Sequence, residues 1–290
     1  MKLTFFLVLF FTQLSLIGVS QDSRPNILLI VADDLGYSDL GAYGSEISTP
    51  FLDKIAEQSI RFSNFHAMPS CTPTRAILMT GTDNHLVGLG SQEGGFTENQ
   101  KGKAGYEGYL NERVATLPQV LATSGYRTYM SGKWHLGHHD EHGPSKRGFQ
   151  ETFALMQGGA SHFSDQIPLD PNDPTVYRRN GKVVKDLPDD FYSTKNYTDS
   201  LLTWVERDKD SSQPFFAYLA YTAPHDPLQA PQSYIDKYKG VYDEGYEILR
   251  ERKFKALKQK GLIPAGETLA LWSHIQKTNW PKFLVPPIKI

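Results

Sequence analysis

The sequence predicts an α/β fold, in which a mainly parallel sheet is sandwiched by helices. Apolar segments typical of strands alternate along the chain with segments of helical periodicity, and this order favours parallel strand pairing. The chain has 290 residues, of which 39% are hydrophobic, enough to bury a substantial core. We therefore expect a globular protein built around one sheet.

The first expected strand is Asn26–Ala32, "NILLIVA", a continuous apolar run without polar alternation. Such a run is typical of a central parallel strand that is covered on both faces. A helix is expected next, because Thr49 supplies an N-cap, Pro50 follows it, and the apolar residues of 51–60 recur at roughly helical spacing. A strand followed by a helix begins an α/β pattern.

The same alternation continues further along the chain. It predicts a helix from Thr116 to Gly125, a strand over Tyr126–Ser131, an amphipathic helix within Tyr192–Asp208, a buried strand over Pro214–Tyr221 and a charged, solvated helix over Glu247–Lys260. These segments complete the expected sheet and its helical layers.

Charge and the N-terminal segment restrict the class of protein. The 30 basic and 32 acidic residues are spread evenly and form no basic patch, so nucleic acid is not an expected partner. Met1–Ser20 combines an early lysine, an apolar run and a small-residue cleavage site, which favours a secretory signal peptide over a membrane anchor. We expect an exported chain, periplasmic or secreted, without stable membrane insertion.

Unusual polar residues follow three of the expected strands. Asp33 and Asp34 come after the first strand, Lys133 and His135 after the second, and His225 after the third. Ligands of open α/β sheets bind at the carboxyl ends of the strands, so we expect these side chains to converge. Adjacent carboxylates suit Ca²⁺ or Mg²⁺, although capping of a turn is the simpler interpretation of the aspartate pair.

The single cysteine of the chain is Cys71, in "SCTPTRAI". One cysteine forms no intramolecular disulfide, so Cys71 is either a buried apolar residue or a reactive group. A helix is expected just after it, ending near Gly81, and a helix N-terminus lowers the pKa of a thiol and attracts anions. Arg75 would add positive charge for an anionic substrate. A cysteine hydrolase that uses one of the histidines stays open as an alternative.

Cys71-Thr72-Pro73-Thr74-Arg75 matches the C-x-P-x-R signature of the type I sulfatases. "PNILLIVADDLGYSDLGAYG", "GYRTYMSGKWHLG" and "PFFAYLAYTAPHDPLQAP" also resemble sulfatase motifs, in the order of the family. The resemblance extends from Pro25 to about Ile263. It implies a sulfatase fold of the alkaline phosphatase superfamily and an arylsulfatase-like sulfuric ester hydrolase.

The resemblance also implies a cofactor and a metal. A maturation enzyme would oxidise Cys71 to Cα-formylglycine, whose hydrate supplies the nucleophilic oxygen. Asp33 and Asp34 would bind Ca²⁺ together with the residue at position 71, and Arg75 would orient the hydrate.

Further roles follow from the same resemblance. Lys133 and His225 would bind the sulfate, His135 would act as a base, and His225 is a candidate general acid for the leaving alcohol or phenol. Ser161, in "GGASHF", would be a further substrate-binding residue. The expected substrate is a sulfate ester of a small molecule or a glycan.

The chain departs from the family after Ile263, because the Asp-Asn pair that completes the calcium site of sulfatases and a downstream lysine are not found there. We expect residues 21–263 to form the N-terminal part of a catalytic domain that is incomplete at its C-terminus, followed by an atypical tail over 264–290 without the C-terminal domain of the family. Weak calcium binding, an uncovered sheet edge and little activity would follow. The alternatives are a phosphonate or phosphodiester hydrolase of the same superfamily and a truncated, non-catalytic product.

Overall fold

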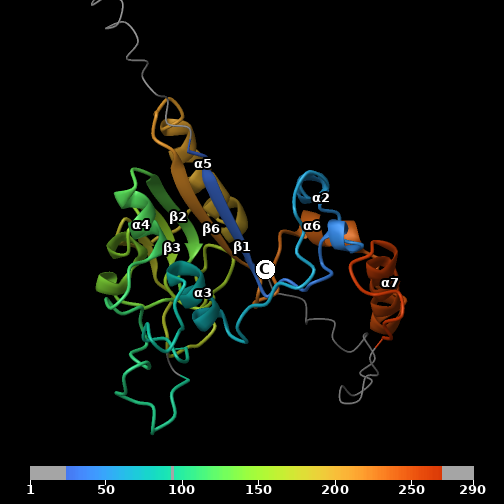
Figure 1. Cartoon of the computed structure of the whole chain (residues 1–290), viewed down its shortest axis with the longest axis horizontal. Coiled ribbons are helices and arrows are strands. Elements are labelled where there is room, and N and C mark those ends of the chain that lie inside the picture. The colour runs from blue at the N-terminus through green and yellow to red at the C-terminus, as the bar shows by residue number, and fades with distance from the viewer. Residues whose placement is uncertain (1–23, 93–94, 270–290) are drawn as a thin grey trace, which may run out of the picture.

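The computed structural model describes residues 24–92 and 95–269, which form a six-stranded sheet, helices that pack on it and a separate group of helices (Figure 1). The strands are β1 (Ile27–Asp33), β2 (Arg127–Lys133), β3 (Glu151–Leu155), β4 (Tyr177–Arg179), β5 (Lys182–Val184) and β6 (Phe215–Pro224). The helices are α2 (Pro50–Glu57), α3 (Cys71–Thr80), α4 (Leu117–Thr123), α5 (Ser193–Arg207), α6 (Gln232–Ile235) and α7 (Tyr246–Gln259).

The strands lie in the order β1-β6-β2-β3-β4-β5. The pairs β1–β6, β6–β2 and β2–β3 are parallel, whereas β4 and β5 extend the sheet as an antiparallel hairpin. The prediction of a mainly parallel sheet is therefore confirmed. The short β3, β4 and β5 strands were not predicted.

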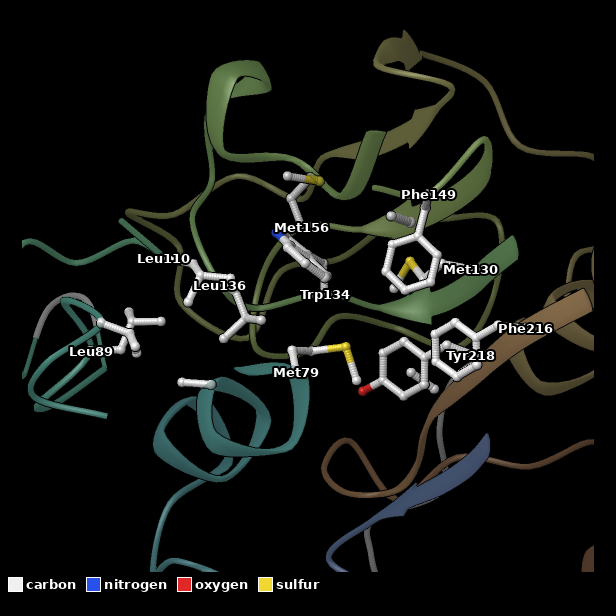
Figure 2. Packing of buried hydrophobic residues seen from close by; sticks show 14 of the residues in the cluster. Met79, Leu89, Leu110, Met130, Trp134, Leu136, Phe149, Met156, Phe216 and Tyr218 are labelled. Atoms are coloured by element: carbon white, nitrogen blue, oxygen red, sulfur yellow. The ribbon is translucent and has the colours of Figure 1, made fainter. Parts of the chain in front are cut away.

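Helices cover both faces of the central part of the sheet. Successive residues of β6 divide between two hydrophobic clusters, because side chains of a strand alternate between its faces. Phe216 and Tyr218 pack with Met79 of α3 in the cluster of Figure 2, and Leu219 packs with Trp204 of α5 in the other. The sheet thus has a filled core on each side.

The position of β1 corrects one prediction. Among the described strands, this one lies at the edge of the sheet and pairs with β6 alone. Ile27 and Leu29 pack against the core, but Leu28 and Ile30 on the opposite face are 53% and 46% exposed. An unbroken apolar run carries no information on whether a face is covered, so the expected central position was wrong.

The helix expected over 51–60 is α2, which ends at Glu57 and buries none of its residues. Figure 1 shows α2, α6 and α7 set apart from the sheet. Side chains tie this group together: Lys253 of α7 forms ion pairs with Asp39 and Glu46, which precede α2. The expected charged helix is confirmed as α7, although Leu257 is buried.

Within the residues that the structure describes, no helix is both long enough and apolar enough to cross a bilayer. The predicted signal peptide, Met1–Ser20, lies outside the described residues, as does the tail from residue 270 onward.

Candidate active site

The carboxyl ends of three neighbouring strands bring the predicted polar residues together. Asp33 is the last residue of β1, Lys133 is the last residue of β2, and His225 directly follows β6, which lies between the other two strands. The three strands are parallel, so these ends lie at one edge of the sheet. Convergence of the motifs at this edge was predicted from the sequence.

Helix α3 delivers the cysteine to this edge. The backbone of Ser70 is extended, the helix begins at Cys71, and Gly81 ends it in the left-handed conformation with φ of 65°. Cys71 is a free thiol and is partly buried. Its Sγ lies 3.2 Å from Nδ1 of His135, and Oγ1 of Thr72 lies 3.2 Å from the same nitrogen.

Beneath the thiol, Asp33, Arg75 and Lys133 form a buried ion cluster, each side chain being at most 8% exposed. Nη2 of Arg75 is 3.2 Å from Oδ1 of Asp33, and Nζ of Lys133 is paired with Oδ2. Nη1 of Arg75 donates to the carbonyl of Lys133 at 3.0 Å and to the hydroxyl of Tyr218 at 3.1 Å. Two cations share one carboxylate, so the cluster carries a net positive charge that favours an anion.

The cations also affect the titration of their neighbours. Burial, followed by the charge of Arg75, lowers the pKa of Lys133. Burial, followed by the charges of Lys133 and Arg75, holds the pKa of His135 well below its usual value. His135 is therefore neutral at physiological pH and has a lone pair available to accept a proton.

His225 lies at the same edge, and its contacts show which ring nitrogen faces the site. Its Nδ1 donates to the carbonyl oxygen of Asp226 at 2.8 Å, because a carbonyl only accepts. The other nitrogen, Nε2, lies 3.8 Å from Oδ2 of Asp34, whose side chain is 69% exposed. Nε2 is thus the nitrogen that faces the open part of the site.

Two site residues have unusual backbone conformations. Asp34 and His135 have φ values of 62° and 54°, in the left-handed region that residues with a side chain rarely occupy. Such residues concentrate at functional sites, where the surrounding structure holds them.

The family model described as Sulfatase matches residues 25–275. This chain belongs to the sulfatase family. It is 47% identical over 271 residues to an uncharacterized sulfatase of Schizosaccharomyces pombe, covering 90% of this chain and 49% of that protein. It is 44% identical over 246 residues to an arylsulfatase of Klebsiella aerogenes, covering 84% of this chain and 52% of that protein. The sulfatase chain thus spans about half the length of these curated relatives.

Solved structures agree with the family. The crystal structure of Ps i-CgsB in complex with a neocarrahexaose superposes with a TM-score of 0.64 at 33% identity, covering 83% of this chain and 56% of that one. The structure of BT4656 in complex with its substrate D-glucosamine-2-N,6-O-disulfate superposes with a TM-score of 0.56 at 26% identity, covering 76% of this chain and 38% of that one. The predicted sulfatase-like α/β fold is confirmed.

Within the sulfatase signature, buried polar atoms lack hydrogen bonds, and an oxygen-bearing group at position 71 would suit them. Nε and Nη2 of Arg75 are buried and, within residues 24–92 and 95–269, make no hydrogen bond, although Nη2 is ion-paired with Asp33. Arg75 lies one helical turn from Cys71 on α3. The buried Nε–H of Arg75 is therefore the group best suited to donate to a formylglycine.

The calcium ligands that the sulfatase resemblance implies are present only in part. Asp33 already neutralises two cations, and Asp34 is largely exposed. Nowhere in the described part of the chain do three or more His, Cys, Asp or Glu side chains form a metal-binding group. Ca²⁺ takes six to eight oxygens, so the described residues do not by themselves complete a calcium site.

Ser161 is a buried residue close to the site. The residue is 2% exposed, and its hydroxyl donates to Oε1 of Gln229 at 3.2 Å. Its neighbour Gly158 packs on the ring of His135, where an added Cβ would lie 2.7 Å from Cε1. Ser161 is therefore held against Gln229, and its contact with a substrate remains a prediction.

Sequence reasoning missed four further polar residues around the site. Thr72 contacts His135, Tyr218 contacts Arg75, and Gln92 lies 3.3 Å from the hydroxyl of Ser70, whereas Gln229 holds the 161–162 segment. Tyr218 sits inside an apolar strand and Gln92 inside a long loop, so no local pattern distinguishes them. Thr72 lies inside the signature, and Tyr218 and Gln229 lie inside another family-like motif, so membership of a motif was their available sequence signal.

Proposed function

We propose that this sulfatase chain carries the site for hydrolysis of sulfuric esters, with the residue derived from Cys71 as the nucleophile. The observation that carries the proposal is the contact of 3.2 Å between Sγ of Cys71 and the neutral His135, next to a cluster of net positive charge. An activated nucleophile, a base and positive charge for a developing anion are the three requirements of ester hydrolysis by this route.

We further propose that a maturation enzyme converts Cys71 to Cα-formylglycine. The complete C-x-P-x-R signature and the buried Nε of Arg75, which makes no hydrogen bond within the described residues, support this assignment. When present, the formylglycine supplies the oxygen nucleophile for attack at sulfur. An ordinary cysteine hydrolase is the less favourable alternative, since its covalent intermediate would not require the signature.

The residues of the chain then have separate roles. Lys133 and Arg75 offset the negative charge of the sulfate oxygens, as their net positive cluster favours an anion. His225 contacts the sulfate through Nε2 and, when both nitrogens of its ring are protonated, donates the Nε2 proton to the leaving alcohol or phenol. His135 accepts a proton at position 71, since its lowered pKa leaves the ring unprotonated at neutral pH.

Asp33 and Asp34 are proposed as two ligands of Ca²⁺. A cation here would offset the carboxylate of Asp34, which lies close to His225. The described residues contain no group of three or more His, Cys, Asp or Glu side chains that could hold a metal ion, so we expect weak calcium binding and slow turnover by the 290-residue chain.

The substrate class is proposed from the relatives. Curated relatives include arylsulfatases and N-acetylgalactosamine-6-sulfatases, and two structural neighbours carry sugar ligands. We propose an aryl or glycan sulfate ester. Export to the periplasm or out of the cell remains a prediction from Met1–Ser20.

The test is hydrolysis of an aryl sulfate by the 290-residue chain co-expressed with a maturation enzyme, with and without Ca²⁺. We expect slow turnover that disappears in Cys71→Ala, and mass spectrometry should show the aldehyde at position 71. A matched aryl phosphonate or phosphodiester serves as the competing substrate. Faster cleavage of that substrate would favour the alternative hydrolase, and an aldehyde without any turnover would contradict activity of this chain.

A further inference from the structure

A buried histidine that the proposed reaction does not use lies next to the turn that carries His225. His162 is 1% exposed, and its Nδ1 is 2.6 Å from Oγ of Ser193. Ser193 is the first residue of α5, and its N–H donates to the carbonyl of His162 at 2.9 Å. Two hydrogen bonds therefore fix His162 to the start of this helix.

On its other side, His162 is joined to the turn after β6. Oε1 of Gln229 accepts from the N–H of His162 at 2.8 Å and from the hydroxyl of Ser161 at 3.2 Å. The N–H of Gln229 donates to the carbonyl of Pro227 at 2.8 Å. One carboxamide thus links residues 161 and 162 to the segment that follows His225.

The ring of His162 points to the same segment. Burial lowers the pKa of His162 and favours a neutral ring, whereas the main-chain carbonyls of His225 and Pro227 oppose this effect, so they lie close to the ring. A neutral ring has one N–H, and carbonyls only accept. We therefore assign the proton to Nε2, which donates to the turn, while Nδ1 accepts from Ser193.

The glycines that precede His162 reach both active-site histidines. A Cβ on Gly158 would lie 2.7 Å from Cε1 of His135. A Cβ on Gly159 would lie 3.2 Å from the carbonyl oxygen of Asp226, the atom that accepts from Nδ1 of His225. Residues 158–162 therefore contact the ring of one histidine and the carbonyl that orients the other.

From these contacts we propose that His162 and Gln229 are positioning residues that hold the turn of His225 so that Nε2 of His225 faces the active site. The proposal rests on the proposed function for the role of His225, but the geometry it concerns is measurable without turnover. Without these contacts, the Asp226 carbonyl would no longer be held against Nδ1, and the proton of the His225 ring would redistribute between its two nitrogens. Displacement of a reacting group by about 1 Å lowers a rate by up to about 100-fold.

The experiment measures the tautomer of His225 at fixed neutral pH by long-range ¹H–¹⁵N NMR of the full 290-residue chain, with signals assigned through His225→Asn. The wild type should show a single Nδ1–H tautomer. His162→Leu and the milder Gln229→Ala should give a mixture of tautomers. His162→Gln, which keeps an N–H donor near the position of Nε2, should restore most of the wild-type signal.

A matched control removes a partly buried hydrogen bond in the amino-terminal half of β2. The hydroxyl of Tyr129 donates to Asp208 at 2.6 Å, so Tyr129→Phe should lower stability and leave the tautomer of His225 unchanged. An unchanged Nδ1–H signal in folded Gln229→Ala would overturn the proposal, and so would an equal change in Tyr129→Phe. Where the matured chain turns over an aryl sulfate, kcat should be lowest in the variant that loses most of the Nδ1–H tautomer. If the variants change the tautomer as expected but the wild-type chain shows no turnover, the result would contradict the proposed function and leave the positioning proposal standing.

Discussion

Asp33 balances the charge of the candidate site. Its two carboxylate oxygens face different cations, Arg75 and Lys133, and all three side chains are almost completely buried. A buried cation without a partner is strongly unfavourable, whereas an exposed carboxylate contributes little. The adjacent Asp34 is largely exposed, so the two neighbouring aspartates differ strongly in their contribution to the stability of the fold.

Asp33→Asn should therefore lower the free energy of unfolding by about 3–5 kcal/mol, the usual cost of breaking a buried ion pair. Asp34→Asn is the matched control and should change it by less than about 0.5 kcal/mol. Urea unfolding with a chelator present measures both, so that metal binding does not contribute. Equal losses in the two variants would contradict the buried cluster.

At the scale of elements, the close approach of β2 and β6 places Lys133 at the site. Gly132 has φ of 119°, and a Cβ there would lie 1.9 Å from the carbonyl oxygen of Ala220 in β6. A side chain at this position would push the two central strands apart. The conformation of Gly132 therefore allows Lys133 to emerge beside the carboxyl end of β6.

Gly132→Ala should destabilise the fold by at least about 3 kcal/mol, because the clash is with main chain that cannot move aside. Gly266→Ala is the control, since nothing lies within 4 Å of the added methyl group. Thermal unfolding followed by circular dichroism compares the two. A Gly132→Ala chain as stable as Gly266→Ala would show that β2 and β6 are further apart than described.

At the scale of the whole molecule, apolar side chains lie uncovered on β1 and α2. Leu28 and Ile30 of the edge strand are about half exposed, and Phe51 and Ile55 of α2 are 83% and 61% exposed. An unpaired edge with apolar side chains promotes association with other chains. This chain spans about half the length of the curated relatives it matches.

We expect the 290-residue chain to associate as its concentration rises, as measured by sedimentation velocity. Ile30→Lys should reduce association without unfolding the sheet, because the side chain already contacts solvent. Leu29→Lys, on the opposite face, should unfold the chain, since Leu29 packs against the core. A monomeric wild-type chain at high concentration would contradict this expectation.

Local features of the sequence predicted most of the fold. Helical spacing, the helix that starts at Thr116 and the apolar run of β6 depend on neighbouring residues, and the structure confirms each of them, whereas the expected N-cap Thr49 makes no capping hydrogen bond to α2. The carboxyl-end rule then grouped Asp33 with His225 although they are far apart in the sequence. Thr116 and Gln119 form a capping box, so two residues close together in the sequence fix the start of α4.

By itself, therefore, the sequence determined the alternation of elements, the sulfatase signature and the edge of the sheet at which the candidate site residues meet. Only the tertiary structure decided that β1 is an edge strand, that Ser161 is buried against Gln229 and that His162 supports the turn of His225. The physical reason is that periodicity and capping are set by residues a few positions apart. Strand order and buried hydrogen bonds depend on which distant segments meet, and no local pattern encodes that.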